Sequence, residues 1–85
     1  MTLSDADRAI LDLEREWWTR PGTKAAAIRQ ELGLSSSRYY RRVGQLLDLP
    51  GALSYDPLTV KRLRRLRDQR RRHRYEGRRA DPESR

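Results

Sequence analysis

The chain has no cysteine and only one histidine, His73, and these absences restrict its chemistry. Without thiols it can form neither disulfides nor the thiolate sites that hold structural zinc. His73 has no second histidine or cysteine at metal-ligand spacing, so we expect no zinc site and no cofactor. The lack of cysteine also fits a reducing cytosol.

Long apolar runs are absent as well. No stretch approaches the roughly 20 apolar residues that a membrane-spanning helix needs. The amino-terminal segment contains Ser4, Asp5 and Asp7 and is acidic, unlike the apolar centre of a secretion signal. We therefore expect a cytoplasmic protein, with no membrane contact, that is located in the nucleoid if it binds DNA.

The sequence also lacks the patterns that carry common enzyme chemistry. No glycine-rich phosphate loop follows a strand, and no paired carboxylates lie in an apolar setting that would tune them for catalysis. The serines at 35–37 have no base near them in sequence and suit helix capping or groove contacts better than nucleophilic attack. We predict that the protein is not an enzyme.

Apolar residues are scarce relative to charge. In 85 residues, 35% are hydrophobic and 38% are charged, which allows one domain with a small core. Chains of this size often gain stability from a ligand or a partner chain, so homodimerisation stays open.

Positive charge is what the chain has in excess. Twenty lysines and arginines stand against twelve aspartates and glutamates, for a net charge of +8. Residues 1–50 carry 8 basic and 7 acidic residues, and residues 51–85 carry 12 and 5, so the net charges are +1 and +7. Eighteen of the basic residues are arginines, whose planar forks match phosphate oxygens and guanine edges. This composition is typical of a nucleic-acid-binding protein.

Apolar spacing and capping residues predict only helices. Serine or threonine precedes the first three helices, and Asp56-Pro57 precedes the fourth. We predict an all-α fold, a small helical domain with helices near residues 4–19, 24–32, 35–48 and 57–73. We assign residues 1–76 to one domain and residues 77–85 to a disordered tail, and we interpret residues 52–55 as a linker with at most one helical turn.

The spacing also predicts which side chains face inward. The expected core positions are Ala6, Ile10, Leu13, Trp17, Ile28, Leu32, Tyr39, Val43, Leu46, Leu47, Val60, Leu63 and Leu66. Trp18 should pack on a flank. The acidic residues of the first helix should form a solvated face with local pairs such as Glu16 with Arg20; they are Asp5, Asp7, Asp12, Glu14 and Glu16.

Residues 25–44 fit a helix-turn-helix. Ile28 and Leu32 supply one side of the helix contact, Gly33 the turn, and Tyr39 and Val43 the other side. Arg29 departs from the pattern, because the residue after Ile28 is usually small at the helix crossing. The second helix would offer its outer residues to the major groove of DNA, where we expect contacts from Ser35, Ser36, Ser37, Tyr40 and Arg41. Arg38 and Arg42 would contact flanking phosphates. The alternative is a structural helical corner with an exposed basic face.

The fourth predicted helix is rich in arginine. We expect it to contact the DNA backbone through Lys61, Arg62, Arg64, Arg65, Arg67 and Arg71. Such a helix repels itself when isolated, so its carboxyl-terminal part should become ordered on nucleic acid. The alternative is a basic tail that only raises the local concentration near nucleic acid.

Three stretches resemble a known family: residues 32–40 (LGLSSSRYY), 46–53 (LLDLPGAL) and 56–67 (DPLTVKRLRRLR). They look like a family of small actinobacterial proteins catalogued mainly as a domain of unknown function with a predicted helix-turn-helix. The resemblance covers roughly residues 3–72 and implies an actinobacterial source and that motif, but no biochemical role. The corner is also similar to the DNA-binding region of sigma factors.

These patterns favour a DNA-binding protein that acts as a transcriptional regulator or nucleoid-associated factor on double-stranded DNA. One alternative is an RNA-binding or ribosome-associated factor, which the arginine-rich end would suit. Another is a module that contacts RNA polymerase through Trp17, Trp18 and the acidic first helix.

Overall fold

The computed structural model describes residues 3–80, with side chains as far as His73, and every regular element within that range is a helix. The elements are α1 (Asp5–Glu16), the 3₁₀ turn η1 (Trp17–Thr19), α2 (Lys24–Leu32), α3 (Ser36–Leu46), α4 (Pro50–Tyr55) and α5 (Pro57–Ala80). The predicted all-α class is confirmed. No helix within residues 3–80 combines the length and apolar character needed to cross a membrane.

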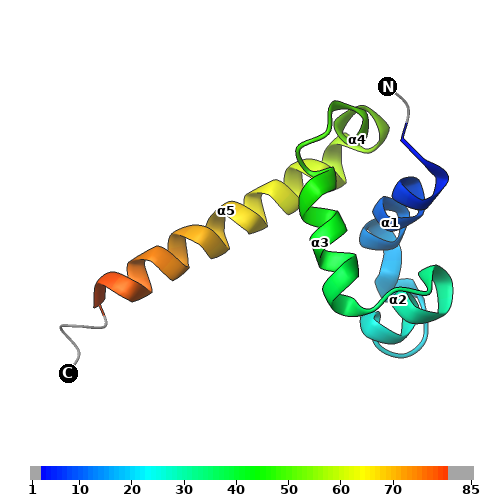
Figure 1. Cartoon of the computed structure of the whole chain (residues 1–85), viewed down its shortest axis with the longest axis horizontal. Coiled ribbons are helices and arrows are strands. Elements are labelled where there is room, and N and C mark those ends of the chain that lie inside the picture. Colours follow the sequence, from blue (N-terminus) through cyan, green and yellow to red (C-terminus); the bar gives the residue numbers. More distant parts are fainter. Residues whose placement is uncertain (1–2, 81–85) are drawn as a thin grey trace.

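The helices form a small globule with one long projection. Helices α1 to α4 and the start of α5 pack together, while the rest of α5 extends away from the other helices (Figure 1). The described molecule measures 48 × 31 × 20 Å along its principal axes. Because α5 has 24 residues, at 1.5 Å per residue it is about 36 Å long.

Side-chain caps fix where the helices begin. The hydroxyl oxygens of Ser4, Thr23 and Ser35 each accept a hydrogen bond from a backbone N–H three residues later, at 3.1, 3.1 and 3.3 Å. Asp56 caps α5 in the same way, by accepting from the N–H of Thr59 at 3.2 Å. These contacts satisfy N–H groups that have no partner inside the helix, and they confirm the predicted starts.

One continuous core lies where α1, α2, α3, α4 and the start of α5 meet. Its buried residues are Ile10, Leu11, Leu13, Ala27, Ile28, Tyr39, Val43, Leu46, Leu47, Ala52 and Val60. Trp17, Leu32, Leu34 and Leu63 are half-buried against it. Trp18, which was predicted to pack on a flank, is 56% exposed, and Leu66, which was predicted to face inward, is 39% exposed.

Several predicted boundaries and faces are wrong. Helix α1 ends at Glu16, and the predicted linker at 52–55 belongs to α4. Helix α5 continues to Ala80 instead of ending near residue 73, so residues 77–80 of the predicted tail are helical; residues 81–85 lie outside the described residues. Ala6 is exposed, because the buried face of α1 is rotated toward Asp7, Leu11 and Glu14.

The predicted solvated acidic face of α1 is also wrong in part. The local pair between Glu16 and Arg20 is present at 3.5 Å. Asp7 and Glu14, however, are only 6% and 4% exposed. A buried carboxylate must be paired and hydrogen-bonded to stay ionised, so these two residues need internal partners.

Candidate nucleic-acid interface

A three-residue turn, Gly33 to Ser35, joins α2 to α3. Gly33 has a φ of +67°, in the left-handed region that residues with a Cβ atom avoid. Its backbone N–H donates a hydrogen bond to the carbonyl oxygen of Arg29 at 3.0 Å. The departure noted at Arg29 causes no crowding, because Arg29 is exposed and the small Ala27 is the buried neighbour of Ile28. The glycine therefore lets the chain reverse sharply and present α3 on the surface.

Helix α3 has one buried face and one polar face. Tyr39, Val43 and Leu46 lie in the core. The predicted DNA-contacting residues Ser35, Ser36, Ser37, Arg38, Tyr40 and Arg41 are all exposed. At 100° per residue, Ser37 and Arg41 lie on one line of the helix, opposite the buried face, with Arg38 beside them. We call Ser36, Ser37, Arg38 and Arg41 the α3 face.

Arg42 differs from its neighbours, because it holds α3 against α1. Its Nε and Nη2 donate to Oδ1 and Oδ2 of Asp7 at 2.9 and 2.7 Å. These hydrogen bonds keep the pKa of Asp7 below its usual value, although burial opposes this, and they raise the pKa of Arg42. The guanidinium that was predicted to contact phosphate is thus engaged by an internal carboxylate and positions the helix.

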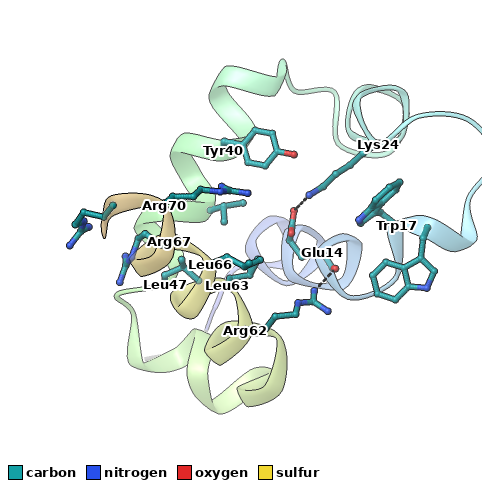
Figure 2. Close-up of a pocket in the computed structure, with 14 residues that line it drawn as sticks. Glu14, Trp17, Lys24, Tyr40, Leu47, Arg62, Leu63, Leu66, Arg67 and Arg70 are labelled. Carbon is teal, nitrogen blue, oxygen red and sulfur yellow. Dashed lines mark hydrogen bonds and ion pairs between the residues drawn. The ribbon is translucent and has the colours of Figure 1, made fainter. Parts of the chain in front are cut away.

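A second polar cluster joins α1, α2 and α3 inside the protein. Lys24 Nζ lies 2.8 Å from Glu14 Oε2, and the Tyr39 hydroxyl donates a hydrogen bond to the same oxygen (the Lys24 contact is dashed in Figure 2). Tyr39 is fully buried, and burial raises the pKa of its hydroxyl far above the usual value, followed by the effect of Glu14. The cluster was missed from the sequence, where Glu14 looked like one more surface acid on a charged helix.

Three of the six predicted basic contacts on α5 fasten that helix to the globule. Arg62 Nη2 donates to the carbonyl oxygen of Glu14 at 2.9 Å (Figure 2). Its guanidinium carbon lies 5.9 Å from the centre of the Trp18 ring. Arg64 Nε donates to the carbonyl of Leu47 at 2.8 Å. Arg67 Nη1 lies 3.3 Å from Asp48 Oδ1. These arginines set the direction in which α5 leaves the globule.

The other basic residues of α5 whose side chains are described point to solvent. Lys61, Arg65, Arg70, Arg71 and Arg72 are exposed, and no carboxylate among the side chains of residues 3–73 pairs with them. Arg38 and Arg41 of the α3 face are equally unpaired within that range. The structure thus separates the predicted basic residues into internal tethers and two open surfaces, one on α3 and one along α5.

No group of three or more histidine, aspartate or glutamate side chains lies close enough to hold a metal ion among the described residues. Of the three buried carboxylates among the described residues, Asp7 and Glu14 are bound to cations, and Asp56 caps α5 and lies 3.8 Å from Arg15.

A family model matches residues 2–75, which is most of the chain. The chain belongs to the family described as "Protein of unknown function (DUF3263)". This membership confirms the resemblance to a domain of unknown function. No significant match was found among curated proteins or solved structures.

Proposed function

We propose that this protein binds double-stranded DNA through a helix-turn-helix formed by α2, the turn at Gly33 and α3. One observation carries the proposal. Within residues 3–73, the buried acids of α1 are used by Arg42 and Lys24, whereas Arg38 and Arg41 project from the α3 face without an acidic partner. The buried acids of α1 are thus paired inside the globule, whereas the positive charges on the exposed side of α3 remain unpaired within residues 3–73.

The dimensions of α3 suit a major groove. Its 11 residues span about 16 Å, and an α-helix fits the groove of B-form DNA, which is about 12 Å wide. The small side chains of Ser36 and Ser37 allow close approach near the amino end of the helix, whose dipole attracts phosphate. Arg41 then lies one turn further along the same line, where its fork can bind guanine O6 and N7.

Helix α5 supplies the second part of the proposal. Its exposed arginines continue beyond the globule, where they can follow the sugar-phosphate backbone next to the site occupied by α3 (Figure 1). Phosphate contacts add affinity and fix orientation without reading sequence. This division of labour fits a transcriptional regulator or nucleoid-associated factor, and we place it in the nucleoid of an actinobacterium, the source that the family resemblance implies.

The decisive experiment compares two doubly substituted proteins that lose the same charge. One carries Arg38→Ala and Arg41→Ala on the α3 face, and the other carries Arg8→Ala and Arg15→Ala on α1. Binding to a labelled 20-base-pair duplex is measured by fluorescence anisotropy in about 0.15 M salt, where the Debye length is about 8 Å. Circular dichroism verifies that both variants keep their helices.

We expect the α3 variant to bind at least tenfold more weakly and the α1 variant to stay within about threefold of the original protein. Equal losses in the two variants would reject the α3 face as the contact surface. Unlabelled structured RNA is added as competitor. If RNA displaces the duplex more effectively than unlabelled duplex does, the protein is an RNA-binding factor and the proposal is wrong.

A further inference from the structure

An open groove lies between α3 and α5, beside η1 (Figure 2). Its volume is about 590 Å³. Apolar side chains line it from both sides: Val43 comes from α3, Leu47 directly follows α3, and Leu63 and Leu66 come from α5. The groove exists because α5 leaves the globule at an angle to α3 and leaves one side of its apolar line without a helix against it.

Large apolar side chains remain exposed in this groove. Trp18, Tyr40 and Leu66 are 56%, 46% and 39% exposed, and they come from three different elements. Single exposed apolar residues are common on protein surfaces, but a cluster that surrounds a hollow is typical of a binding surface. The groove is therefore a candidate docking site.

The rim of the groove is basic. Arg70 and Arg71 line it, and neither pairs with a carboxylate among the side chains of residues 3–73. Glu14 is the one acidic residue in the lining, and it is buried and bound to Lys24. A partner that buries apolar side chains in this groove would therefore bind more tightly if carboxylates at its edges paired with Arg70 and Arg71.

We propose that the groove binds an acidic amphipathic helix of a partner protein. Its apolar side chains, spaced at i, i+3, i+4 and i+7, would cover Leu63 and Leu66. Glutamates or aspartates on its flanks would meet Arg70 and Arg71. Helix-in-groove recognition uses this combination of apolar anchors and complementary charge.

The same contacts disfavour single-stranded nucleic acid as the occupant. Bases bind such grooves by stacking on free aromatic faces. Here Arg62 lies 5.9 Å from the ring centre of Trp18, and Lys24 lies 5.0 Å from that of Tyr40, so cations already occupy a face of each ring. The aliphatic floor formed by leucine side chains offers nothing on which a base can stack.

A second copy of the chain fits the groove less well. Its α5 would bring further arginines against Arg70 and Arg71, and like charges would repel. Its α1 is acidic, but the apolar face of α1 lies in the core, with Ile10, Leu11 and Leu13 all buried. Charge complementarity therefore selects an acidic partner over self-association.

Both tryptophans of the chain line the groove, so their fluorescence reports occupancy without a label. The probe is an 18-residue peptide without tryptophan that has leucines at i, i+3, i+4 and i+7 and glutamates at most other positions. A peptide of the same composition with scrambled leucine positions is the control. We expect a saturable change in tryptophan emission with the patterned peptide and at least tenfold weaker binding of the scrambled one.

Three variants make the test specific to the groove. Leu66→Glu and the pair Arg70→Glu/Arg71→Glu should each weaken binding at least tenfold at 0.15 M salt. The control pair Arg65→Glu/Arg72→Glu reverses the same number of positive charges at residues of α5 that do not line the groove. It should change binding less than threefold. All four positions and Leu66 are exposed, so the variants should keep the fold.

Any of three results would overturn the proposal. The first is no saturable signal with the patterned peptide. The second is equal losses in the two arginine pairs, which would mean that the peptide binds through net charge only. The third is a dimer in sedimentation equilibrium that Leu66→Glu converts to a monomer, which would assign the groove to a second copy of the chain.

Discussion

At the scale of single residues, Asp7 and Glu14 help to hold α3 in its position. Each is an acid on the inner side of α1, and each binds a cation from another helix: Arg42 of α3 in one case and Lys24 of α2 in the other. A buried carboxylate that loses its cation is strongly destabilising. The Arg42 pair therefore fixes how α3 meets α1, and the Lys24 pair holds α2 against α1. The exposed α3 face thus depends on charges that never touch a ligand.

The Asp7–Arg42 pair makes the stability of the protein depend on pH. The pKa of Asp7 is lowered in the folded protein by hydrogen bonds from Arg42, whereas in the unfolded chain an aspartate titrates near 3.9. The stabilisation is therefore fully present above about pH 4 and is lost as the pH falls through the folded pKa. We expect Asp7→Asn to lower the free energy of unfolding at pH 7 by about 1–3 kcal/mol, measured by urea denaturation.

The difference between the Asp7→Asn variant and the original protein should shrink below about pH 4, where Asp7 becomes protonated first in the unfolded chain and, at lower pH, in the folded protein. Asp5→Asn is the matched control, because the Asp5 side chain is 95% exposed, and a surface ion pair contributes little. A loss of stability for Asp7→Asn that stays constant from pH 7 to pH 3 would show that the carboxylate charge is not the cause.

The amphipathic pattern of α1 explains why these residue roles were mispredicted. A charge on a helix is usually solvated, and the sequence alone gives no sign that Lys24 and Arg42 will fold back onto Glu14 and Asp7. Asp7 lies three residues before Ile10, and Glu14 directly follows Leu13. This spacing places both acids near the apolar side of the helix, and it is the one signal in the sequence that could have indicated their burial. Their partners are far away in sequence, at 35 residues for Arg42, and only the packed fold brings them together.

At the scale of helices, the local signals predicted α2, α3 and the turn between them correctly. Capping serines, the glycine after Leu32 and the apolar spacing are all short-range features, and they act before tertiary packing does. Helix α4 was missed because its six residues begin at Pro50-Gly51, a pair that usually marks a turn. Pro50 is the first residue of that helix, where a missing N–H costs nothing.

Two glycines, Gly33 in the turn between α2 and α3 and Gly44 within α3, offer a matched pair of substitutions. Gly33→Ala forces a Cβ into a left-handed conformation, so it should lower the free energy of unfolding by about 1–2 kcal/mol. Gly44→Ala lies within α3, has open space around the new Cβ and should raise that free energy by about 0.5–1 kcal/mol. Thermal unfolding monitored by circular dichroism measures both. If both variants change stability in the same direction, backbone conformation is not the cause.

At the scale of the whole molecule, the end of α5 could not be predicted from apolar spacing. No leucine, isoleucine or valine follows Leu66, so the pattern that defines a buried helix stops there. Helix α5 nevertheless continues to Ala80, because arginine and glutamine have high helix propensity and no proline interrupts them before residue 82. The result is a basic arm that extends away from the helices carrying the α3 face (Figure 1).

This shape predicts how DNA binding depends on salt. If the α3 face and α5 together neutralise about 6–8 phosphates, a plot of log K against log salt should have a slope of about −5 to −7. Changing Arg65, Arg70, Arg71 and Arg72 to glutamine removes exposed charges of the arm alone, so the slope should become shallower by about 2–4. The pair Arg8→Gln/Arg15→Gln on α1 should change it by less than about 1. Anisotropy titrations between 0.05 and 0.3 M salt measure the slopes. An unchanged slope in the arm variant would mean that α5 makes no phosphate contacts, and that α3 and its flanking residues carry the whole electrostatic contribution.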